Sequence, residues 1–363
     1  MKFSCKTENL KKGLTTISHV VGKSHNLPIL QNVLLSVEDG VLKLATTNLE
    51  IGIQTIINGK AHKTGSVTVP ARLLTDYINN LSAETVDIST QKTNLHITAE
   101  KSQTTIKGMD ASEFPLLPTI EAKARFGIHG ALLKSALQQT VFASANDTTR
   151  PELCTVLMLI ANNKLTLAAT DSYRLAEKVI DVDISEQFEV LVPQSTLQEV
   201  YRVFDDNIDE VVVEISDNQI KFSHSQTYLI SRVSEGQFPD YKQIIPDKSN
   251  TTAQVSVLLF SKAIRAASIF CRQGINDVKV VFGKNNLKVY AVNDQVGESQ
   301  VEVEAEVKGG DGEIVFNYHY LLDVLAVQET DTVLFGMTKN DLPGVITPVG
   351  DDTYTYVIMP IRQ

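Results

Sequence analysis

The stretch LTLAATDSYRLAE, residues 165–177, recurs in part at two other places in the chain. Residues 42–48 read LKLATTN and residues 287–293 read LKVYAVN, but the run DSYRL follows only the middle copy. The first leucines of the three copies lie 123 and 122 residues apart (165 − 42 and 287 − 165). A sequence motif that recurs at a fixed interval predicts an internally repeated fold. In this chain, the middle copy of the motif has a feature that the other two lack.

Other markers recur at nearly the same interval. VTVP at 67–70 matches VLVP at 190–193 and IVFN at 314–317, and Phe114-Pro115 matches Phe238-Pro239. The last two markers lie 124 residues apart (238 − 114). Three periods of this length nearly fill the 363 residues, so the sequence predicts three copies of one unit.

Each copy has the same order of expected elements. Apolar residues at helical spacing, such as Leu10, Leu14 and Ile17, predict a helix near the start of the copy. A second helix is expected after the marker that ends in proline or asparagine, since a helix tolerates proline in its first turn. Alternating strands follow each helix. We therefore expect an α+β fold of three tandem domains, each with two helices on one face of antiparallel sheet and a duplicated β-α-β-β-β order. The expected boundaries are 1–121, 122–248 and 249–363.

Composition limits the class of protein. A net charge of −10 argues against a protein that coats nucleic acid by bulk charge, although a local basic strip is compatible with it. The three cysteines are far apart, which excludes a C-x-x-C motif and fits a reducing cytosol. MKFSCKTENL has no apolar core of signal-peptide length, and the apolar run VLMLI at 156–160 is too short to span a bilayer. We expect a cytoplasmic protein without a membrane partner.

Motifs for catalysis or metal binding are absent from the sequence. Gly-Lys-Ser at 22–24 lacks the upstream glycine of a phosphate-binding loop, because that position is Ile17. The seven histidines are scattered, and none pairs with another at metal-ligand spacing. We therefore expect no catalytic residue, no metal and no cofactor.

Charge is distributed unevenly over the expected elements. A dense acidic run that includes Glu298, Glu302 and Glu304 lies among the strands of the third copy. Basic residues recur on the polar faces of the expected helices, which favours a functional basic side over ordinary solvated faces. The candidates for this side are Lys12, Lys134, Arg202, Lys262 and Arg265.

Six segments together resemble the bacterial β sliding clamps, the processivity subunits of DNA polymerase III. They are MKF at 1–3, LPIL at 27–30, VPAR at 69–72, ATDSYRLA at 169–176, FPDY at 238–241 and YVIMPIR at 356–362. They occur in family order and reach all three copies. The resemblance implies a head-to-tail dimer whose six similar units form a closed ring around duplex DNA, with helices lining the hole. A heterologous interface that closes after two copies produces such a ring.

The resemblance also implies a hydrophobic cleft between the second and third domains for short peptide motifs of partner proteins. Methionine, leucine and proline would form an adaptable apolar trough, and Arg174 and Arg362 could hold an acidic or amide end of the peptide. The residues carried over to this cleft are Leu153, Thr170, Ser172, Tyr173, Arg174, Leu175, Pro239, Ile244, Asn317, Tyr320, Val357, Met359, Pro360, Ile361 and Arg362.

Two further surfaces follow from the resemblance. DNA contacts are expected around residue 24 and at 147–152, where this chain has Lys23, Ser24 and Arg150; we expect Lys23 and Arg150 to carry the charge. The dimer seam is expected to join the first domain to the third domain of the partner, pairing edge strands of both. Its residues would be Arg72, Lys101, Ile106, Lys107, Ile269, Phe270, Glu298, Glu302 and Glu304.

The expected function is that of a non-catalytic ring that tethers partners to DNA by linkage and makes only weak, sequence-independent phosphate contacts. The implied partners are a second copy of the chain, double-stranded DNA, the catalytic subunit of DNA polymerase III, the clamp loader, translesion polymerases, mismatch-repair proteins and ligase. Two alternatives stay open from the residues alone. One is a β-rich scaffold that binds proteins without encircling DNA, and the other is a hydrolase with a long-range site near Asp171 and Ser172.

Overall fold

The structure, a computed structural model, describes residues 1–22, 27–147, 149–184 and 186–362. It divides into two compact parts, residues 1–133 with 195–233 and residues 134–194 with 234–363. The middle of the three sequence copies contributes to both parts. Within the described ranges, no helix has the length and apolar character needed to cross a membrane.

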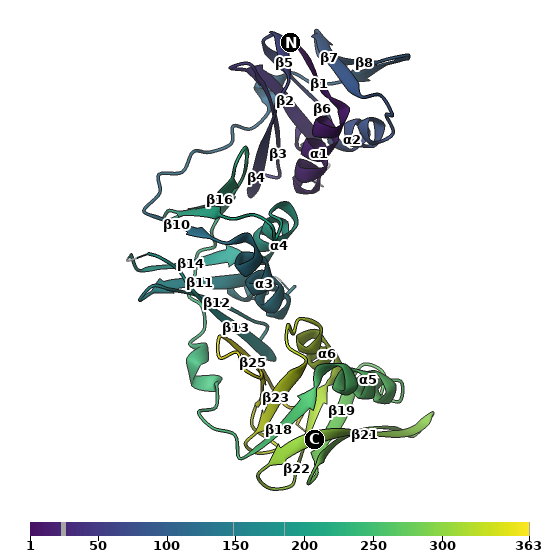
Figure 1. Cartoon of the computed structure of the whole chain (residues 1–363), viewed down its shortest axis with the longest axis vertical. Helices are drawn as coiled ribbons and strands as arrows, with labels where there is room; N and C mark the ends of the chain where they lie inside the picture. Colours follow the sequence, from purple (N-terminus) through teal and green to yellow (C-terminus); the bar gives the residue numbers. More distant parts are fainter. Residues whose placement is uncertain (23–26, 148, 185, 363) are drawn as a thin grey trace. The chain divides into compact units, whose positions relative to one another are not determined.

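The first repeat contains the expected β-α-β-β-β order twice (Figure 1). A short additional strand, β5 (Lys60–Lys63), separates the two halves. The first half consists of β1 (Lys2–Lys6), α1 (Thr7–Ile17), β2 (Asn32–Glu38), β3 (Val41–Thr47) and β4 (Ile51–Ile57). The second half consists of β6 (Gly65–Pro70), α2 (Ala71–Asn79), β7 (Thr85–Gln91), β8 (Asn94–Ala99) and β9 (Ser102–Lys107).

The second and third repeats have the same order, which confirms the predicted three-fold duplication. The second repeat has β10 (Ala124–Ile128), α3 (Gly130–Thr140), β11 (Thr155–Ala161), β12 (Lys164–Thr170), β13 (Arg174–Asp181), then β14 (Phe188–Pro193), α4 (Gln194–Val203), β15 (Val211–Ile215), β16 (Gln219–His224) and β17 (Thr227–Arg232). The third has β18 (Thr251–Ser256), α5 (Val257–Ser268), β19 (Asp277–Phe282), β20 (Asn286–Asn293), β21 (Gly297–Lys308), then β22 (Gly312–Asn317), α6 (Tyr318–Ala326), β23 (Thr332–Met337), β24 (Gly344–Pro348) and β25 (Tyr354–Ile358).

The two halves of each repeat exchange their first strands. In the first repeat β1 pairs with β7 of the other half, and β6 pairs with β2. The same exchange occurs in β10–β15 and β14–β11, and again in β18–β23 and β22–β19. Each half therefore completes the sheet of the other, so neither half can form its sheet alone.

The sheets also continue from one repeat into the next. Strand β4 pairs antiparallel with β17, which gives an eight-stranded sheet of order β10-β15-β16-β17-β4-β3-β2-β6. Strand β13 pairs antiparallel with β25 within a twelve-stranded sheet of order β14-β11-β12-β13-β25-β24-β23-β18-β21-β20-β19-β22. A five-stranded sheet, β5-β1-β7-β8-β9, completes the first repeat. Both junctions join the last strand of a first half to the last strand of a second half.

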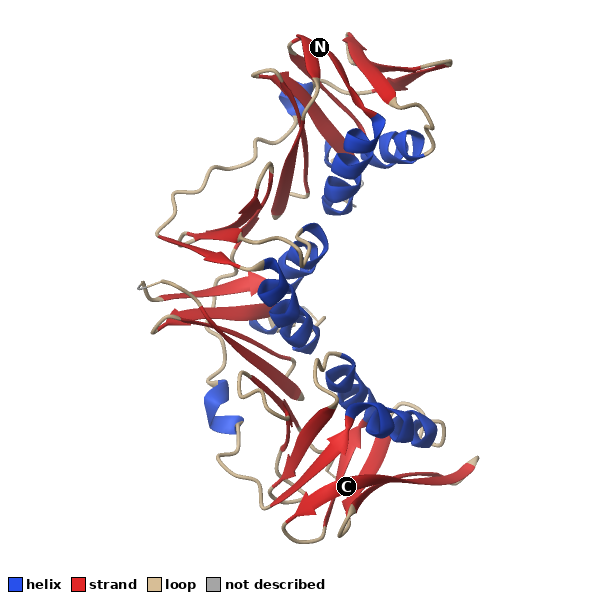
Figure 2. Cartoon of the chain, in the orientation of Figure 1, coloured by secondary structure: helices blue, strands red, loops and turns tan. Residues whose placement is uncertain are grey.

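Helices lie on one side of the strands within each part (Figure 2). In α1 the residues Leu10, Leu14 and Ile17 are buried, as their spacing predicted, and the opposite side carries exposed Lys12. Gly13 allows α1 to approach β4 closely, because a Cβ there would lie 2.4 Å from Ile57 Cδ1. A narrow apolar stripe of α1 therefore packs against the sheet, and the polar residues of the helix face solvent.

A backbone clip closes each repeat after its final strand. Thr68 of β6 exchanges hydrogen bonds with Met109, with N···O distances of 3.3 and 2.9 Å. Ser234 N donates to Leu191 O of β14 at 2.8 Å, and Ile361 N donates to Val315 O of β22 at 2.8 Å. Residues 68, 191 and 315 are equivalent positions, 123 and 124 apart. The C-terminal segment is therefore the third copy of this clip.

Candidate functional site

The turn after β12 repeats one in the first copy that is built from side-chain hydrogen bonds. Thr170 Oγ1 donates to Arg174 O at 2.6 Å, and Asp171 Oδ1 accepts from Tyr173 N and Arg174 N at 2.9 and 3.0 Å. Ser172 has a left-handed backbone, with φ of 76°. A short polar side chain that accepts from the backbone two residues on is the usual means of fixing such a turn.

The first copy forms the same turn with different residues. Thr47 Oγ1 donates to Ile51 O at 2.9 Å, and Asn48 Oδ1 accepts from Glu50 N and Ile51 N at 3.0 and 2.7 Å. Leu49, at the position of Ser172, has φ of 77°. The repeated sequence element therefore encodes a turn. What distinguishes the middle copy is the set of residues placed on it.

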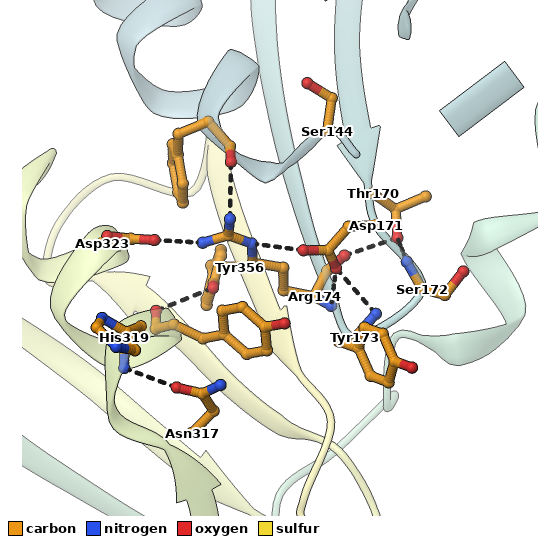
Figure 3. Close-up of polar contacts among 12 residues, drawn as sticks. Ser144, Thr170, Asp171, Ser172, Tyr173, Arg174, Asn317, His319, Asp323 and Tyr356 are labelled. Carbon is orange, nitrogen blue, oxygen red and sulfur yellow. Dashed lines mark hydrogen bonds and ion pairs between the residues drawn. The ribbon is translucent and has the colours of Figure 1, made fainter. Parts of the chain in front are cut away.

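Arg174 takes the place of the buried Ile51 and links several elements through its guanidinium (Figure 3). Its Nε donates to Asp171 Oδ2 at 2.9 Å, one terminal nitrogen donates to Asp323 Oδ2 at 2.5 Å, and the other donates to Phe142 O at 3.0 Å. The Arg174 side chain is only 10% exposed. These charge-assisted bonds tie β13 of the second repeat to α6 of the third.

Aromatic rings surround this arginine. Its guanidinium carbon lies 4.6 Å from the ring centroid of Tyr320 and 5.3 Å from that of Phe142. Tyr356 Oη donates to Tyr320 O at 2.9 Å, which also holds the start of α6. Tyr173 stacks on Tyr320 with centroids 6.5 Å apart and remains 62% exposed. We call Phe142, Tyr173, Tyr320 and Tyr356 the aromatic group. Arg174 packs against Phe142 and Tyr320, whereas Tyr173 is open to a ligand.

Phenol and thiol groups near the cleft stay protonated at neutral pH. Burial raises the pKa of Tyr320, and the neighbouring carboxylate of Asp171 adds to this effect. Burial also raises the pKa of the Cys154 thiol, together with the charges of Asp147 and Glu152. A raised pKa keeps each group in its weakly nucleophilic protonated form.

An apolar floor lies beside the turn. Leu175 and Val357 are adjacent on the paired strands β13 and β25 and belong to one buried cluster. The segment after β17 adds Phe238 and Tyr241, whose rings meet edge to face. Met359, which follows β25, donates its backbone N–H to Tyr173 O at 2.8 Å. The remaining members of the cluster are Leu157, Ala168 and Leu191, with Leu159 and Ile245 packed against them.

The residues carried over to the cleft differ in how much surface they offer. Leu153, Thr170, Leu175 and Val357 are buried and can only support the floor. Pro239, Asn317, Tyr320, Met359, Pro360 and Ile361 are half-buried, whereas Ser172, Tyr173, Ile244 and Arg362 are exposed. The Asn317 side chain caps α6 by accepting from His319 N at 3.0 Å.

Several contributors were missed by sequence reasoning. Phe142 and Asp323 hold Arg174 but belong to helical segments whose apolar or polar pattern gives no sign of that contact. Tyr241 donates to Glu177, as does Lys242, and so fixes the segment after β17. The repeated Phe-Pro marker did point to this segment, although not to its role.

The turn does not resemble a hydrolase site. Ser172 Oγ accepts from Arg150 Nη1 at 3.0 Å, and both carboxylate oxygens of Asp171 are occupied by Arg174 and backbone N–H groups. A serine nucleophile needs an adjacent base that is free to take its proton. Across the described residues, no group of three or more His, Cys, Asp or Glu side chains is arranged to hold a metal ion.

The basic candidates for a DNA-facing side are placed mostly on helices. Lys12 on α1 and Lys262 and Arg265 on α5 are exposed, and Lys134 lies on α3. Arg202 on α4 is paired with Glu199 at 2.5 Å, and Arg150 contacts Glu152 at 3.2 Å. Lys23 and Ser24 lie outside the described residues.

The candidates for a dimer seam lie on two sheet edges and on neighbouring helical segments. Arg72 is exposed on α2, Ile106 is buried on β9, and Phe270 is half-buried after α5. β9 is the last strand of the five-stranded sheet and pairs only with β8. Residues 297–304 of β21 pair only with β20, and the pairing of β21 with β18 begins at 305. Ile269, just after α5, is 76% exposed. Among the residues that the structure describes, the free edges of β9 and β21 and the side chain of Ile269 are therefore uncovered.

Comparison with known proteins was made for the whole chain. Family models of the DNA polymerase III beta subunit match residues 1–118 (N-terminal domain), 127–240 (central domain) and 242–362 (C-terminal domain). The beta sliding clamp of Staphylococcus aureus is 31% identical over 377 residues, covering 100% of this chain and 99% of that protein. The beta sliding clamp of Synechococcus elongatus is 31% identical over 373 residues with the same coverage.

Solved structures give the same result. The DNA polymerase III subunit beta of Pseudomonas aeruginosa superimposes with a TM-score of 0.96 at 29% identity, covering 100% of both chains. A sliding clamp from the same organism bound to griselimycin has the same TM-score, identity and coverage. The DNA polymerase sliding clamp of Bacillus subtilis has a TM-score of 0.95 at 28% identity, covering 100% of this chain and 99% of that one.

We predict that Arg174→Met lowers the stability of the part that contains residues 134–194 and 234–363. The change leaves Asp171 and the Phe142 carbonyl without their partner, and removing one member of a buried ion pair costs about 3 kcal/mol. Arg174→Lys should recover only part of the loss, because an ammonium lacks the planar fork of the guanidinium. Calorimetry and hydrogen exchange of β13 and β25 would measure the effect.

The matched control is Arg202→Met. Arg202 is 52% exposed and pairs with a residue on its own helix, so its loss should cost below about 1 kcal/mol. Equal shifts in the two variants would show that Arg174 is an ordinary surface arginine.

Proposed function

The chain belongs to the DNA polymerase III beta subunit family, and from this we propose that two copies close head to tail around duplex DNA and hold partner proteins in the cleft beside Arg174. As a sliding clamp it is a non-catalytic processivity factor of DNA polymerase III. Such a ring keeps its hold on DNA through linkage, while weak phosphate contacts leave it free to slide. We place its action at DNA in the bacterial cytoplasm, and we keep 1–121, 122–248 and 249–363 as the domain boundaries.

The observation that carries the closed ring is the repetition of one strand pairing. β4 with β17 and β13 with β25 each join the last strand of a first half to the last strand of a second half. The last strand of a first half that remains is β21, and the last strand of a second half that remains is β9. Pairing β21 of one copy with β9 of the other would use the same geometry a third time and remove both open edges.

The repeats also give the register of this seam. At the first junction, Thr55 of β4 lies opposite Thr227, the first residue of β17. At the second junction, Lys178 of β13, which is 123 residues after Thr55, lies opposite Tyr354, the first residue of β25. The equivalent of Lys178 in β21 lies a further 123 residues along the chain and is Val301. The equivalent first residue of β9 is Ser102. Ser102 would therefore oppose Val301 of the other copy, and antiparallel pairing would set Thr104 opposite Ser299 and Lys101 opposite Glu302.

Two properties support this register. Ser102, Thr104, Ser299 and Val301 are all half-buried, so the pairing matches like faces of the two sheets. It also brings a basic residue opposite an acidic one on the outer face, which favours cross-strand pairing. The seam proposed on this basis consists of Arg72, Lys101, Ile106 and Lys107 on one copy with Ile269, Phe270, Glu298, Glu302 and Glu304 on the other.

For partner proteins we propose the cleft formed by the aromatic group, the apolar floor and the C-terminal segment. Tyr173, Ile244 and Arg362 are exposed there, and Met359 and Pro360 are half-buried, so an incoming apolar side chain would find both surface and flexible packing. The donors of Arg174 are already bonded within the chain, which makes it a positioning residue for the two tyrosines. Arg362 remains available for an acidic or amide end of the peptide.

The partners proposed for this cleft carry short linear motifs. They are the polymerase catalytic subunit, the clamp loader, translesion polymerases, mismatch-repair proteins and ligase. For DNA we propose non-specific contact through Lys12, Lys134, Arg202, Lys262 and Arg265 on the helices, with Arg150 beside the turn and Lys23 and Ser24 in the loop after α1.

We predict that the protein, once loaded on a nicked circular duplex, stays bound in salt that abolishes phosphate contacts. Linearising the circle should release it, because linkage ends when the DNA has free ends. Gel filtration before and after cutting would measure retention. Equal retention on circular and linear DNA would refute the ring and leave the protein-only scaffold as the better account.

We predict that Thr104→Cys combined with Ser299→Cys gives a covalently closed dimer under mild oxidation. Directly opposed residues of an antiparallel pair have Cα atoms about 4.5–5.5 Å apart, which lies within the Cα range of a disulfide. The control, Thr104→Cys with Val301→Cys, shifts the pair by two residues and should cross-link far less. Non-reducing electrophoresis distinguishes them, and preferential cross-linking of the control would mean that the register is wrong.

We predict that Met359→Ala weakens binding of a fluorescent peptide from the tail of the polymerase catalytic subunit by about tenfold, or 1.4 kcal/mol. This change keeps the backbone clip at Ile361, whereas deleting the C-terminal segment would remove it. Leu342→Ala, at a residue 39% exposed elsewhere in the third repeat, is the control and should leave affinity unchanged. Unchanged affinity in both variants would place the peptide site elsewhere.

A further inference from the structure

The five-stranded sheet of the first repeat has an uncovered face on the side away from α1 and α2. Phe3, Cys5 and Ile88 point into the core and are buried, so the alternate residues Lys2 and Lys6 point outward. We call the outward side of β5-β1-β7-β8-β9 the basic sheet face. It lies across the sheet from the helices that carry the proposed DNA-facing residues.

Cations crowd this face and the strand ends around it. Lys2 lies directly opposite Lys63, and Ser4 lies opposite Lys60, on the antiparallel strands β1 and β5. Like charges placed directly opposite one another destabilise a sheet, so the fold tolerates this arrangement at a cost. The exposed lysines of the face and its edges are Lys2, Lys6, Lys60, Lys63, Lys92, Lys101 and Lys107.

Acidic neighbours do not neutralise the basic sheet face. Asp87 is the carboxylate at its centre, and it accepts from Ser4 Oγ, which also lies 3.0 Å from His62 Nε2. Within the described ranges, none of the seven lysines forms an ion pair, whereas Lys43 on the other sheet of the same repeat contacts Glu38 at 3.0 Å. Lys101 and Lys107 belong to the proposed seam, so the lysines that the closed ring leaves on this face and its edges are Lys2, Lys6, Lys60, Lys63 and Lys92.

The first repeat stands apart from the rest of the chain in charge. Residues 1–121 hold 12 Lys and Arg against 11 Asp and Glu, a balance of +1. The remaining residues hold 21 against 32, a balance of −11, and the two sum to the chain's −10. Seven of the 12 cations of the first repeat are the lysines of this face and its edges.

We propose that the basic sheet face binds the phosphate backbone of a DNA segment lying outside the ring. Its cations are lysines, which act as point charges on phosphates and impose no bidentate geometry. No strand of this sheet contributes an exposed large hydrophobic residue among those the structure describes, and stable protein interfaces need such anchors. The face therefore fits a polyanion that requires no apolar contact, held in a sequence-independent and salt-sensitive way.

Being linked to DNA makes such a weak site effective. A protein that encircles one duplex meets neighbouring segments of the same molecule at high local concentration, so a contact of low intrinsic affinity is populated. The site would restrain sliding at low salt and release as salt rises. It needs neither the peptide cleft nor the helix side, and its failure would leave the ring intact.

The test uses a short linear duplex whose two ends are both blocked by streptavidin, which cannot thread through a closed ring. The variant is the triple change Lys2→Gln, Lys60→Gln and Lys63→Gln. The control is Lys164→Gln, Lys284→Gln and Lys339→Gln, which alters net charge equally at exposed lysines of the other two repeats. Affinity is measured by fluorescence anisotropy over a range of salt concentrations.

We expect the sheet variant to lose about tenfold in affinity at low salt, and the slope of log K against log salt to fall in magnitude by about 2 to 3, since each phosphate contact contributes about 0.9. The control should change affinity less than about twofold. Retention on circular DNA in high salt should be the same for wild type and both variants.

Equal losses in the two triple variants would overturn the proposal, because binding would then follow net charge alone. A sheet variant that binds the blocked duplex normally but loses binding of polyglutamate would overturn it in favour of an acidic protein partner. Changing Lys2, Lys60 and Lys63 to arginine instead should preserve DNA binding, and its loss there would show that the glutamine variant acted by disturbing the sheet.

Discussion

An open sheet edge must be paired, covered or blunted, and this constraint organises the molecule. Each half-repeat lends its first strand to the other half, and four of these exchanged strands, β6, β10, β14 and β22, end the two larger sheets. The last strands of the halves remain, and two pairs of them are satisfied by β4 with β17 and β13 with β25. A chain with three repeats has one more strand of each kind than it can pair by itself. Within one chain, β9 and the first part of β21 therefore lack the partner that β4 and β13 have.

The recurring turn shows how far the sequence could predict the structure. The intervals between LKLATTN, LTLAATD and LKVYAVN were sufficient to predict three repeats, and the helical spacing of Leu10, Leu14 and Ile17 placed the first helix. Both signals are local and periodic, and local periodicity is what a sequence records directly. The exchange of first strands was not predictable in this way, because pairing partners far apart in the chain leave no periodic trace.

The candidate site shows the same limit more sharply. The residues on the turn were identified from the resemblance, yet the partners that fix Arg174 come from distant elements: Phe142 after α3 and Asp323 on α6. The sequence alone does not distinguish a buried arginine from an exposed one on a strand. The difference is visible only when the folded structure shows its hydrogen-bond acceptors. In the fold, the guanidinium lies against Tyr320, on which Tyr173 stacks.

Comparing the first two turns suggests how one repeat acquires a site without changing its fold. The backbone bonds of Thr47 and Asn48 are reproduced by Thr170 and Asp171, and the left-handed residue is retained. Replacing the buried Ile51 by Arg174 exchanges apolar packing for an ionic link. Its acceptors are Asp171 and the Phe142 carbonyl of the second repeat and Asp323 of the third. The site then depends on the junction between two repeats, so it cannot be duplicated at a junction where the acceptors are missing.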